Sequence, residues 1–152
     1  MSAASSSFSP VTIVDVPTRF VAVVRRDVSF AEMGEAQRRA RPLLQAALQA
    51  AEIAPASPPL TVWRMTGDGR VDYAPGVFVA QPLAATGEVS LLTLPAGQAA
   101  HLTLTGGYDQ LPAAWERLFA GCAGRTRTGL NWEVYPAQNA DAAKTDLYSL
   151  LT

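Results

Sequence analysis

Glu133 is the residue whose surroundings best suit chemistry with a small molecule. It lies in the segment Asn131-Trp132-Glu133-Val134-Tyr135, where an acid is set among large aromatic side chains. If this segment is a strand, alternation places Asn131, Glu133 and Tyr135 on one face. A carboxylate in a partly dry, aromatic-lined cleft attracts a flat or cationic guest, because its buried charge is costly and aromatic faces attract cations. The segment therefore predicts affinity for lipophilic aromatic molecules, cations included; the alternative is that Glu133 faces solvent and Tyr135 is a half-buried sheet residue.

Four other residues are candidates for the same site. Tyr108 opens a predicted helix, where its hydroxyl can reach a ligand or close a loop. Trp63 and Met65 share one face of a predicted strand, and we consider the groove and the core equally good places for them. Trp115 lies in the middle of a helical apolar stripe, which favours the core, although its edge can meet the cleft. Arg64 is the approximate counterpart of Glu133 in the first half of the chain, and we expect it to face water.

Composition removes several classes of function. The 152 residues are 49% hydrophobic and 16% charged with a net charge of −1, which argues against disorder and against a nucleic-acid-binding face. His101 and Cys122 are the only histidine and cysteine, too few for a disulfide or a common zinc site, so we expect both to be structural. No apolar run reaches the roughly 18 residues of a membrane-spanning helix, and no secretory signal opens the sequence. We expect a cytoplasmic protein that uses no metal and no cofactor and binds neither nucleic acid nor membrane.

The sequence repeats itself at an offset of 78 residues. Alternating aliphatic residues followed by a proline recur in two segments: Val11, Ile13, Val14 and Val16 before Pro17, and Val89, Leu91, Leu92 and Leu94 before Pro95. Each half is expected to run strand, turn at proline, strand, short loop and helix. We expect residues 1–9 to be a disordered tail and residues 10–152 to form one domain, with halves at about 10–83 and 88–152.

Two helices and two strand pairs complete the expected halves. Apolar residues recur every three or four positions over 33–51 and again over 111–122, with arginines 38, 39 and 41 on the wet face of the first helix. Strands are expected at 60–66 and 71–80, joined by Gly67-Asp68-Gly69, and at 130–135 and 145–151. The fold class is α+β: duplicated ββαββ-like halves, with an antiparallel sheet, two helices and a central ligand groove at the pseudo-two-fold junction.

The stretch from about Val11 to Leu151 resembles the GyrI-like small-molecule-binding domain, also called the bacterial effector-binding domain. The resemblance rests on the strand-proline-strand openings, on Gly106-Gly107-Tyr108 before a helix, and on the strands with Trp132-Glu133-Val134-Tyr135 and Thr145-Asp146-Leu147-Tyr148. It implies a duplicated fold whose central groove has Glu133 at its floor. In multidrug-sensing relatives the matching glutamate accepts hydrophobic cations among aromatic rings.

The resemblance leaves three functions open. The first is a module that senses or sequesters a small ligand through Glu133, Tyr108, Tyr135, Trp63, Met65, Asn131 and Trp115. The second, similar to some stand-alone relatives, is a hydrolase of strained, cyclopropane-bearing electrophiles, with Glu133 as general base and Tyr108 as its partner. The third is a protein-binding role, as in relatives that inhibit DNA gyrase. No helix-turn-helix precedes the domain, so direct DNA binding is not expected, and we expect a monomer or a weak dimer.

Overall fold

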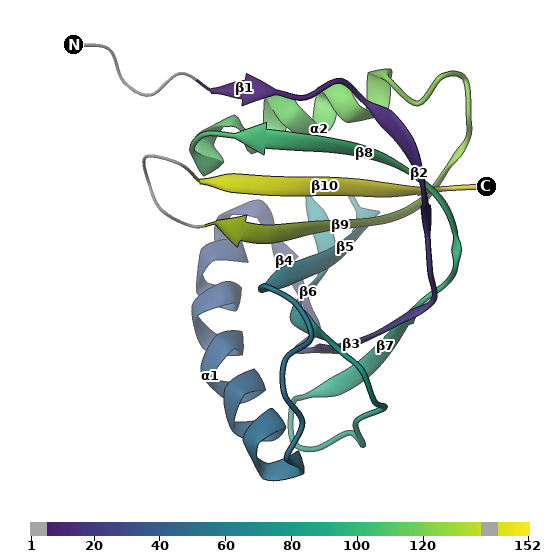
Figure 1. Cartoon of the computed structure of the whole chain (residues 1–152). Coiled ribbons are helices and arrows are strands. Elements are labelled where there is room, and N and C mark those ends of the chain that lie inside the picture. The colour runs from purple at the N-terminus through teal and green to yellow at the C-terminus, as the bar shows by residue number, and fades with distance from the viewer. Residues whose placement is uncertain (1–5, 138–142) are drawn as a thin grey trace. The chain divides into compact units, whose positions relative to one another are not determined.

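The structure, a computed structural model, describes residues 6–137 and 143–152, and these form two compact units. Unit 1 contains residues up to Val16 together with Gly97–Thr152, and unit 2 contains Pro17–Ala96. Each unit is an antiparallel sheet covered by one helix, as predicted for an α+β fold (Figure 1).

Unit 1 arranges its strands in the order β1-β8-β10-β9, with β2 also paired to β8. Its elements are β1 (Ser7–Phe8), β2 (Thr12–Val16), β8 (Gly97–Thr105), the short 3-10 helix η2 (Tyr108–Gln110), α2 (Leu111–Ala120), β9 (Arg127–Ala137) and β10 (Lys144–Leu151). Figure 1 shows β8, β10 and β9 side by side, and α2 packs on β8 and β10. Trp115 and Leu118 of α2 are buried against this sheet, as their spacing predicted.

Unit 2 arranges its strands in the order β5-β6-β3-β7, with β4 also paired to β6. Its elements are β3 (Arg19–Val23), β4 (Arg26–Ser29), the 3-10 helix η1 (Phe30–Glu32), α1 (Met33–Ala51), β5 (Leu60–Gly67), β6 (Arg70–Val79) and β7 (Ser90–Leu94). The helix begins and ends at the residues where the apolar period begins and ends, and Pro42 lies inside it. Ala40, Leu44 and Leu48 of α1 pack with Val77 of β6 in the core of this unit.

The repeat is confirmed by the elements that begin 78 residues apart. Strands β2 and β7, the 3-10 helices η1 and η2, and helices α1 and α2 each start at positions with this offset. The compact units nevertheless differ from the expected halves, since each unit joins the first strand of one repeat to the body of the other. Strand β2 pairs with β8, and β7 pairs with β3. The chain passes between the units next to Pro17 and Pro95, the two prolines that mark the repeat.

Three expectations about local structure were wrong. The end of the expected tail is ordered: Phe8 pairs with Leu104 of β8, and Ser9 N donates to Thr103 O at 2.9 Å. Residues 1–5 lie outside the described part. Strand β9 begins at Arg127, three residues before the expected strand. Arg41 is not on a wet face, because its guanidinium donates to the Gly76 carbonyl at 2.8 Å and the Leu60 carbonyl at 3.0 Å.

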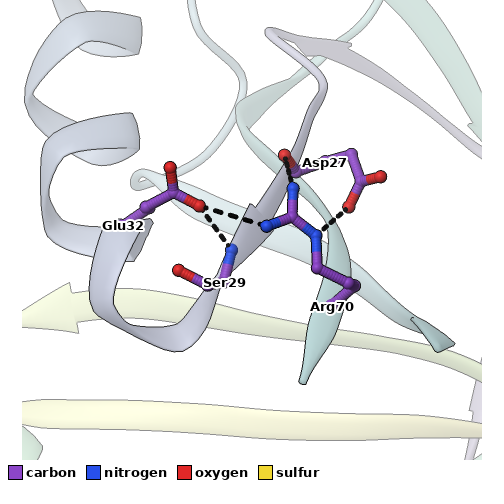
Figure 2. A network of polar contacts seen from close by, with 4 residues as sticks. All are labelled: Asp27, Ser29, Glu32 and Arg70. Atoms are coloured by element: carbon purple, nitrogen blue, oxygen red, sulfur yellow. Dashed lines mark hydrogen bonds and ion pairs between the residues drawn. The ribbon is translucent and has the colours of Figure 1, made fainter. Parts of the chain in front are cut away.

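A polar network fixes the start of η1 in unit 2 (Figure 2). Ser29 N donates to Glu32 Oε1 at 2.8 Å, which closes the first turn, and this backbone bond lowers the pKa of Glu32. Arg70 reaches both Glu32 and Asp27, so it ties β6 to the β4–η1 corner. The Arg70 side chain forms exposed ion pairs with Glu32 and Asp27, so these three charged residues have a structural role.

Within the described residues, no helix combines the length and the apolar character needed to cross a membrane.

Candidate functional site

Strand β9 presents Glu133 and Tyr135 on one face, as alternation predicted. The Tyr135 hydroxyl donates to Glu133 Oε1 at 2.8 Å, so the two side chains lie together. Trp132 points to the opposite face, where its ring stacks on Tyr148 of β10 with centroids 5.2 Å apart and an interplanar angle of 11°. The strand therefore carries Glu133 on the side that faces α2, and the stacked rings of Trp132 and Tyr148 lie on its other side.

The Glu133 carboxylate is buried, with the residue only 7% exposed. Its Oε2 atom accepts a hydrogen bond from Trp115 Nε1 at 2.9 Å, while Oε1 accepts the Tyr135 bond. Both donors are uncharged, so they solvate the carboxylate without neutralising it. Burial raises the pKa of Glu133, and the hydrogen bonds from Trp115 and Tyr135 offset only part of that rise. The alternative that Glu133 faces bulk water is excluded.

Trp115 has a role that the sequence did not show. Its position in the helical stripe predicted a buried residue, and it is 8% exposed. However, its indole N–H also fixes the carboxylate, which joins α2 to β9. A signal was available: the helical period turns Trp115 toward the sheet, and a buried indole N–H requires an acceptor.

Tyr108 is the exposed aromatic residue of this cluster, with 47% of its surface open to solvent. Its ring meets that of Tyr135 edge to face, with centroids 5.9 Å apart. Partial burial, and then the nearby Glu133 charge, raise the pKa of Tyr108. The turn before it needs Gly106, whose φ is +138° and where an added Cβ would lie 2.6 Å from Ser6 Oγ. The turn thus holds the Tyr108 ring against the Tyr135 ring, close to the Glu133 carboxylate.

Asn131 lies on the same face as Glu133 but is engaged within the sheet. Ser149 Oγ donates to its Oδ1 atom at 2.7 Å, and its Nδ2 atom donates to the Gly129 carbonyl at 3.2 Å. The residue is 3% exposed. These contacts assign Asn131 a structural part in joining β9 to β10.

Trp63 and Met65 belong to β5 of unit 2. Unit 1 contains the whole of the Glu133 cluster, which consists of Glu133, Trp115, Tyr135 and Tyr108. Trp63 packs against a buried group that includes Ala36 of α1 and Tyr73 of β6, and Met65 is 47% exposed. Trp63 therefore faces the helix of its own unit. Thr61 and Trp63 share the face of β5 that meets α1, so Arg64 lies on the other face and is not the counterpart of Glu133; it is exposed, as expected.

The opposite face of the unit 1 sheet carries the single histidine, which has a structural partner as expected. His101 Nε2 lies 3.1 Å from Asp146 Oδ1, and Thr103 Oγ1 donates to the same atom at 2.6 Å. The bond to His101 is the main reason that the pKa of Asp146 is lowered. Cys122 is buried, and its thiol donates to the Leu118 carbonyl. Among the described side chains, no group of three or more His, Cys, Asp or Glu residues could hold a metal ion.

The acid of this site is buried, accepts hydrogen bonds from two aromatic side chains and lies on a duplicated α+β fold. The GyrI-like small molecule binding domain matches residues 9–150, so the chain belongs to the GyrI-like family. No protein of curated function is similar enough in sequence to match.

Solved structures with the same fold include EcmrR, which was determined in a complex with DNA, and a hydrolase. EcmrR in its DNA complex has a TM-score of 0.77 at 17% identity; the match covers 95% of this chain and 57% of EcmrR, so the chain spans little more than half of that protein. The EcmrR C-terminal domain alone has a TM-score of 0.76 at 17% identity, covering 93% of this chain and 96% of that one.

Two further structures extend this comparison. SAV2435 bound to tetraphenylphosphonium has a TM-score of 0.65 at 10% identity, with coverage of 95% and 94%. A hydrolase encoded by lin2189 from Listeria innocua has a TM-score of 0.66 at 14% identity, with coverage of 94% and 92%. At these identities the likeness concerns the fold.

The buried acid makes stability depend on pH in a defined direction. Because the pKa of Glu133 is higher in the folded chain than in the unfolded one, the folded state holds its proton longer, and stability falls as pH rises through that interval. We expect Glu133→Gln to remove this loss, since glutamine can accept from Trp115 and donate to the Tyr135 hydroxyl. Melting temperatures measured across pH should show the variant above the wild type at neutral pH, by about 2–4 °C for each kcal/mol recovered. Equal melting temperatures at every pH would contradict this expectation.

Proposed function

We propose that this protein binds lipophilic aromatic compounds, cations included, at the Glu133 cluster, which consists of Glu133, Trp115, Tyr135 and Tyr108. The observation that carries the proposal is a 7% exposed carboxylate whose two described hydrogen-bond donors are both neutral aromatic side chains. Neither donor neutralises the negative charge of Glu133 when this group is ionised. A bound cation therefore lowers the energy of the ionised state.

The arrangement favours guests that bring charge without requiring new hydrogen bonds. The donors from Trp115 and Tyr135 hold one carboxylate oxygen each, which fixes the acid in place. A lipophilic cation with its charge shielded by rings interacts with this carboxylate through space and with the aromatic faces through cation–π contact. Tyr108, half exposed and edge-on to Tyr135, supplies the first ring that an entering guest meets.

Tetraphenylphosphonium is the probe of choice, because SAV2435 of the same fold is bound to it. We expect saturable binding, followed by calorimetry, and quenching of tryptophan fluorescence as the guest contacts Trp115. At a hundred times its dissociation constant the probe should stabilise the fold by about 2.7 kcal/mol, visible as a higher melting temperature. The neutral three-ring compound triphenylphosphine oxide is the matched control and should bind more weakly. Absence of any saturable signal with lipophilic cations would reject the proposal.

A second candidate is hydrolysis of a strained, cyclopropane-bearing electrophile. The raised pKa of Glu133 suits a general base, and the Tyr108 hydroxyl lies in the same cluster. The carboxylate would take a proton from water as the water oxygen bonds to the ring carbon and the strained carbon–carbon bond opens. The electron pair of that bond would pass to the electron-withdrawing group of the electrophile, which then takes the proton back from Glu133, so that one water is added in all. Both carboxylate oxygens already accept hydrogen bonds, so water must first replace one donor, and for this reason we place binding first. Mass spectrometry of such a substrate after incubation decides between them: a product heavier by one water supports hydrolysis, and unchanged compound rejects it.

A further inference from the structure

Unit 2 contains a hollow of about 500 Å³ whose described lining belongs entirely to that unit. It lies between the second half of α1, the connector from α1 to β5, and β6. Its apolar walls consist of aliphatic and proline side chains: Leu44, Leu48, Ile53, Pro55, Pro59 and Val77. Both the volume and the apolar lining are typical of pockets that hold small ligands.

The connector, residues 52–59, is tied to β6, so this wall of the hollow is formed without a ligand. Ala56 N donates to the Phe78 carbonyl at 2.8 Å, and Phe78 N donates to Ser57 Oγ at 3.0 Å. Three of the connector residues are prolines, whose rings restrict the backbone further. A ligand that enters the hollow therefore pays little for ordering the chain.

The hollow offers a ligand no free charge. Among the described residues that line it none is acidic, and Arg41 is the one cation. The Arg41 guanidinium already donates to Gln37 Oε1 at 2.9 Å. It also donates to the carbonyls of Gly76 at 2.8 Å and Leu60 at 3.0 Å, so oxygen atoms of the protein already solvate this charge. An ion moved from water to these walls loses hydration that nothing replaces, so the hollow favours an uncharged ligand.

The polar groups left for a ligand are two amides at the opening of the hollow. Gln45 and Gln49 line it, lie one turn apart on α1 and are both exposed. An amide donates and accepts hydrogen bonds without carrying a charge, which suits a hydroxyl or a carbonyl group. Ser57 also lines the hollow, but its hydroxyl donates to the Pro58 carbonyl at 2.8 Å and accepts from Phe78 N. The lining therefore combines aliphatic walls with neutral hydrogen-bonding groups at the opening.

We propose that this hollow binds an uncharged aliphatic molecule that carries one hydroxyl or carbonyl group. Its hydrocarbon part lies against Leu44, Leu48 and Val77, and its polar group meets the amides of Gln45 and Gln49. This ligand class differs from the one proposed for Glu133, which is aromatic and includes cations. The inference stands on unit 2 alone and does not depend on the Glu133 proposal.

Octanol added to the isotope-labelled full chain tests the site by chemical shifts. We expect saturable shifts in the backbone amides from Leu44 to Ile53 and in the side-chain amides of Gln45 and Gln49. Octanoate and octylammonium share the hydrocarbon chain and differ in the charge of the head. Each should bind about tenfold more weakly than octanol, because its ion loses hydration beside aliphatic walls.

Gln45→Trp and Ala46→Trp form a matched pair of variants at exposed positions of α1. Gln45 lines the hollow, so an indole there occupies the opening and should weaken octanol binding about tenfold. Ala46 does not line the hollow, and the same substitution there should change the affinity less than about twofold. Melting temperatures of both variants show whether the fold is retained.

Any of four results would overturn the site: no saturable shifts up to the solubility limit of octanol, shifts confined to unit 1, a charged analogue bound as tightly as octanol, or equal losses in Gln45→Trp and Ala46→Trp. Glu133→Gln keeps the two proposals distinguishable. The shifts that octanol causes in α1 should be unchanged in that variant, whereas tetraphenylphosphonium binding should fall.

Discussion

Glu133→Gln is expected to weaken binding of tetraphenylphosphonium about a hundredfold. Unit charges about 6 Å apart at an effective dielectric constant of about 20 attract by roughly 3 kcal/mol, and the variant loses that attraction. The shape of the cluster is retained because glutamine matches glutamate in size and can satisfy both Trp115 and Tyr135. Calorimetric titration of the wild type and the variant measures the difference directly.

The matched measurement uses triphenylphosphine oxide, which has similar rings and no net charge. Its affinity should change less than about threefold, since only the charge term differs between the two proteins. Equal losses for the cation and the neutral compound would refute the charge argument and would assign Glu133 a purely structural part.

The same acid predicts how cation binding depends on pH. Because the pKa of Glu133 is raised, the free protein holds a proton on this group above the usual range of a glutamate. A bound cation favours the ionised form, so binding should release a proton and should strengthen as pH rises through the pKa of the free protein. The effect should vanish in Glu133→Gln, which has no titrating group at this position.

Gly76→Ala is expected to lower the stability of the fold by about 2–4 kcal/mol. Gly76 pairs with Val23 across β6 and β3, and an added Cβ would lie 2.4 Å from the Ala22 carbonyl oxygen and 2.7 Å from Val23 Cγ1. The carbonyl oxygen belongs to a buried strand and cannot move without breaking the sheet register. Urea unfolding at equilibrium measures the loss.

Gly97→Ala is the control for the same change in another strand. A Cβ there meets only Leu150 Cδ1 at 3.5 Å, an ordinary contact, and the variant should be as stable as the wild type or slightly more so. Similar stability of the two variants would show that β3 lies farther from Gly76 than these distances indicate.

The periodic features of this fold could be predicted from the sequence because they depend on local spacing. The apolar period over Met33–Ala51 defined α1 to the residue, and the 78-residue offset anticipated the paired starts of β2 and β7 and of both helices. Alternation along β9 likewise placed Glu133 and Tyr135 together, since successive side chains of a strand must point to opposite faces.

The pairings between distant segments could not be predicted in this way. Nothing near Val16 or Pro17 shows that β2 pairs with β8 instead of staying with its own repeat, because a strand edge can accept any strand of suitable pattern. Nor does the sequence around Gly76 reveal the strand that crowds it. The sequence alone predicts that the guanidinium of Arg41 is exposed to solvent. Only the tertiary structure places the carbonyls of Leu60 and Gly76 beside it.

By itself, then, the sequence determined that an acid would share a strand face with tyrosine, and that two helices would each turn an apolar side toward a sheet. Only the tertiary structure decided that the Trp115 indole meets that acid, and that the acid is buried with neutral donors on both oxygens. The physical reason is that burial and hydrogen-bond partners depend on which elements pack together, whereas periodicity records only which side of an element is apolar.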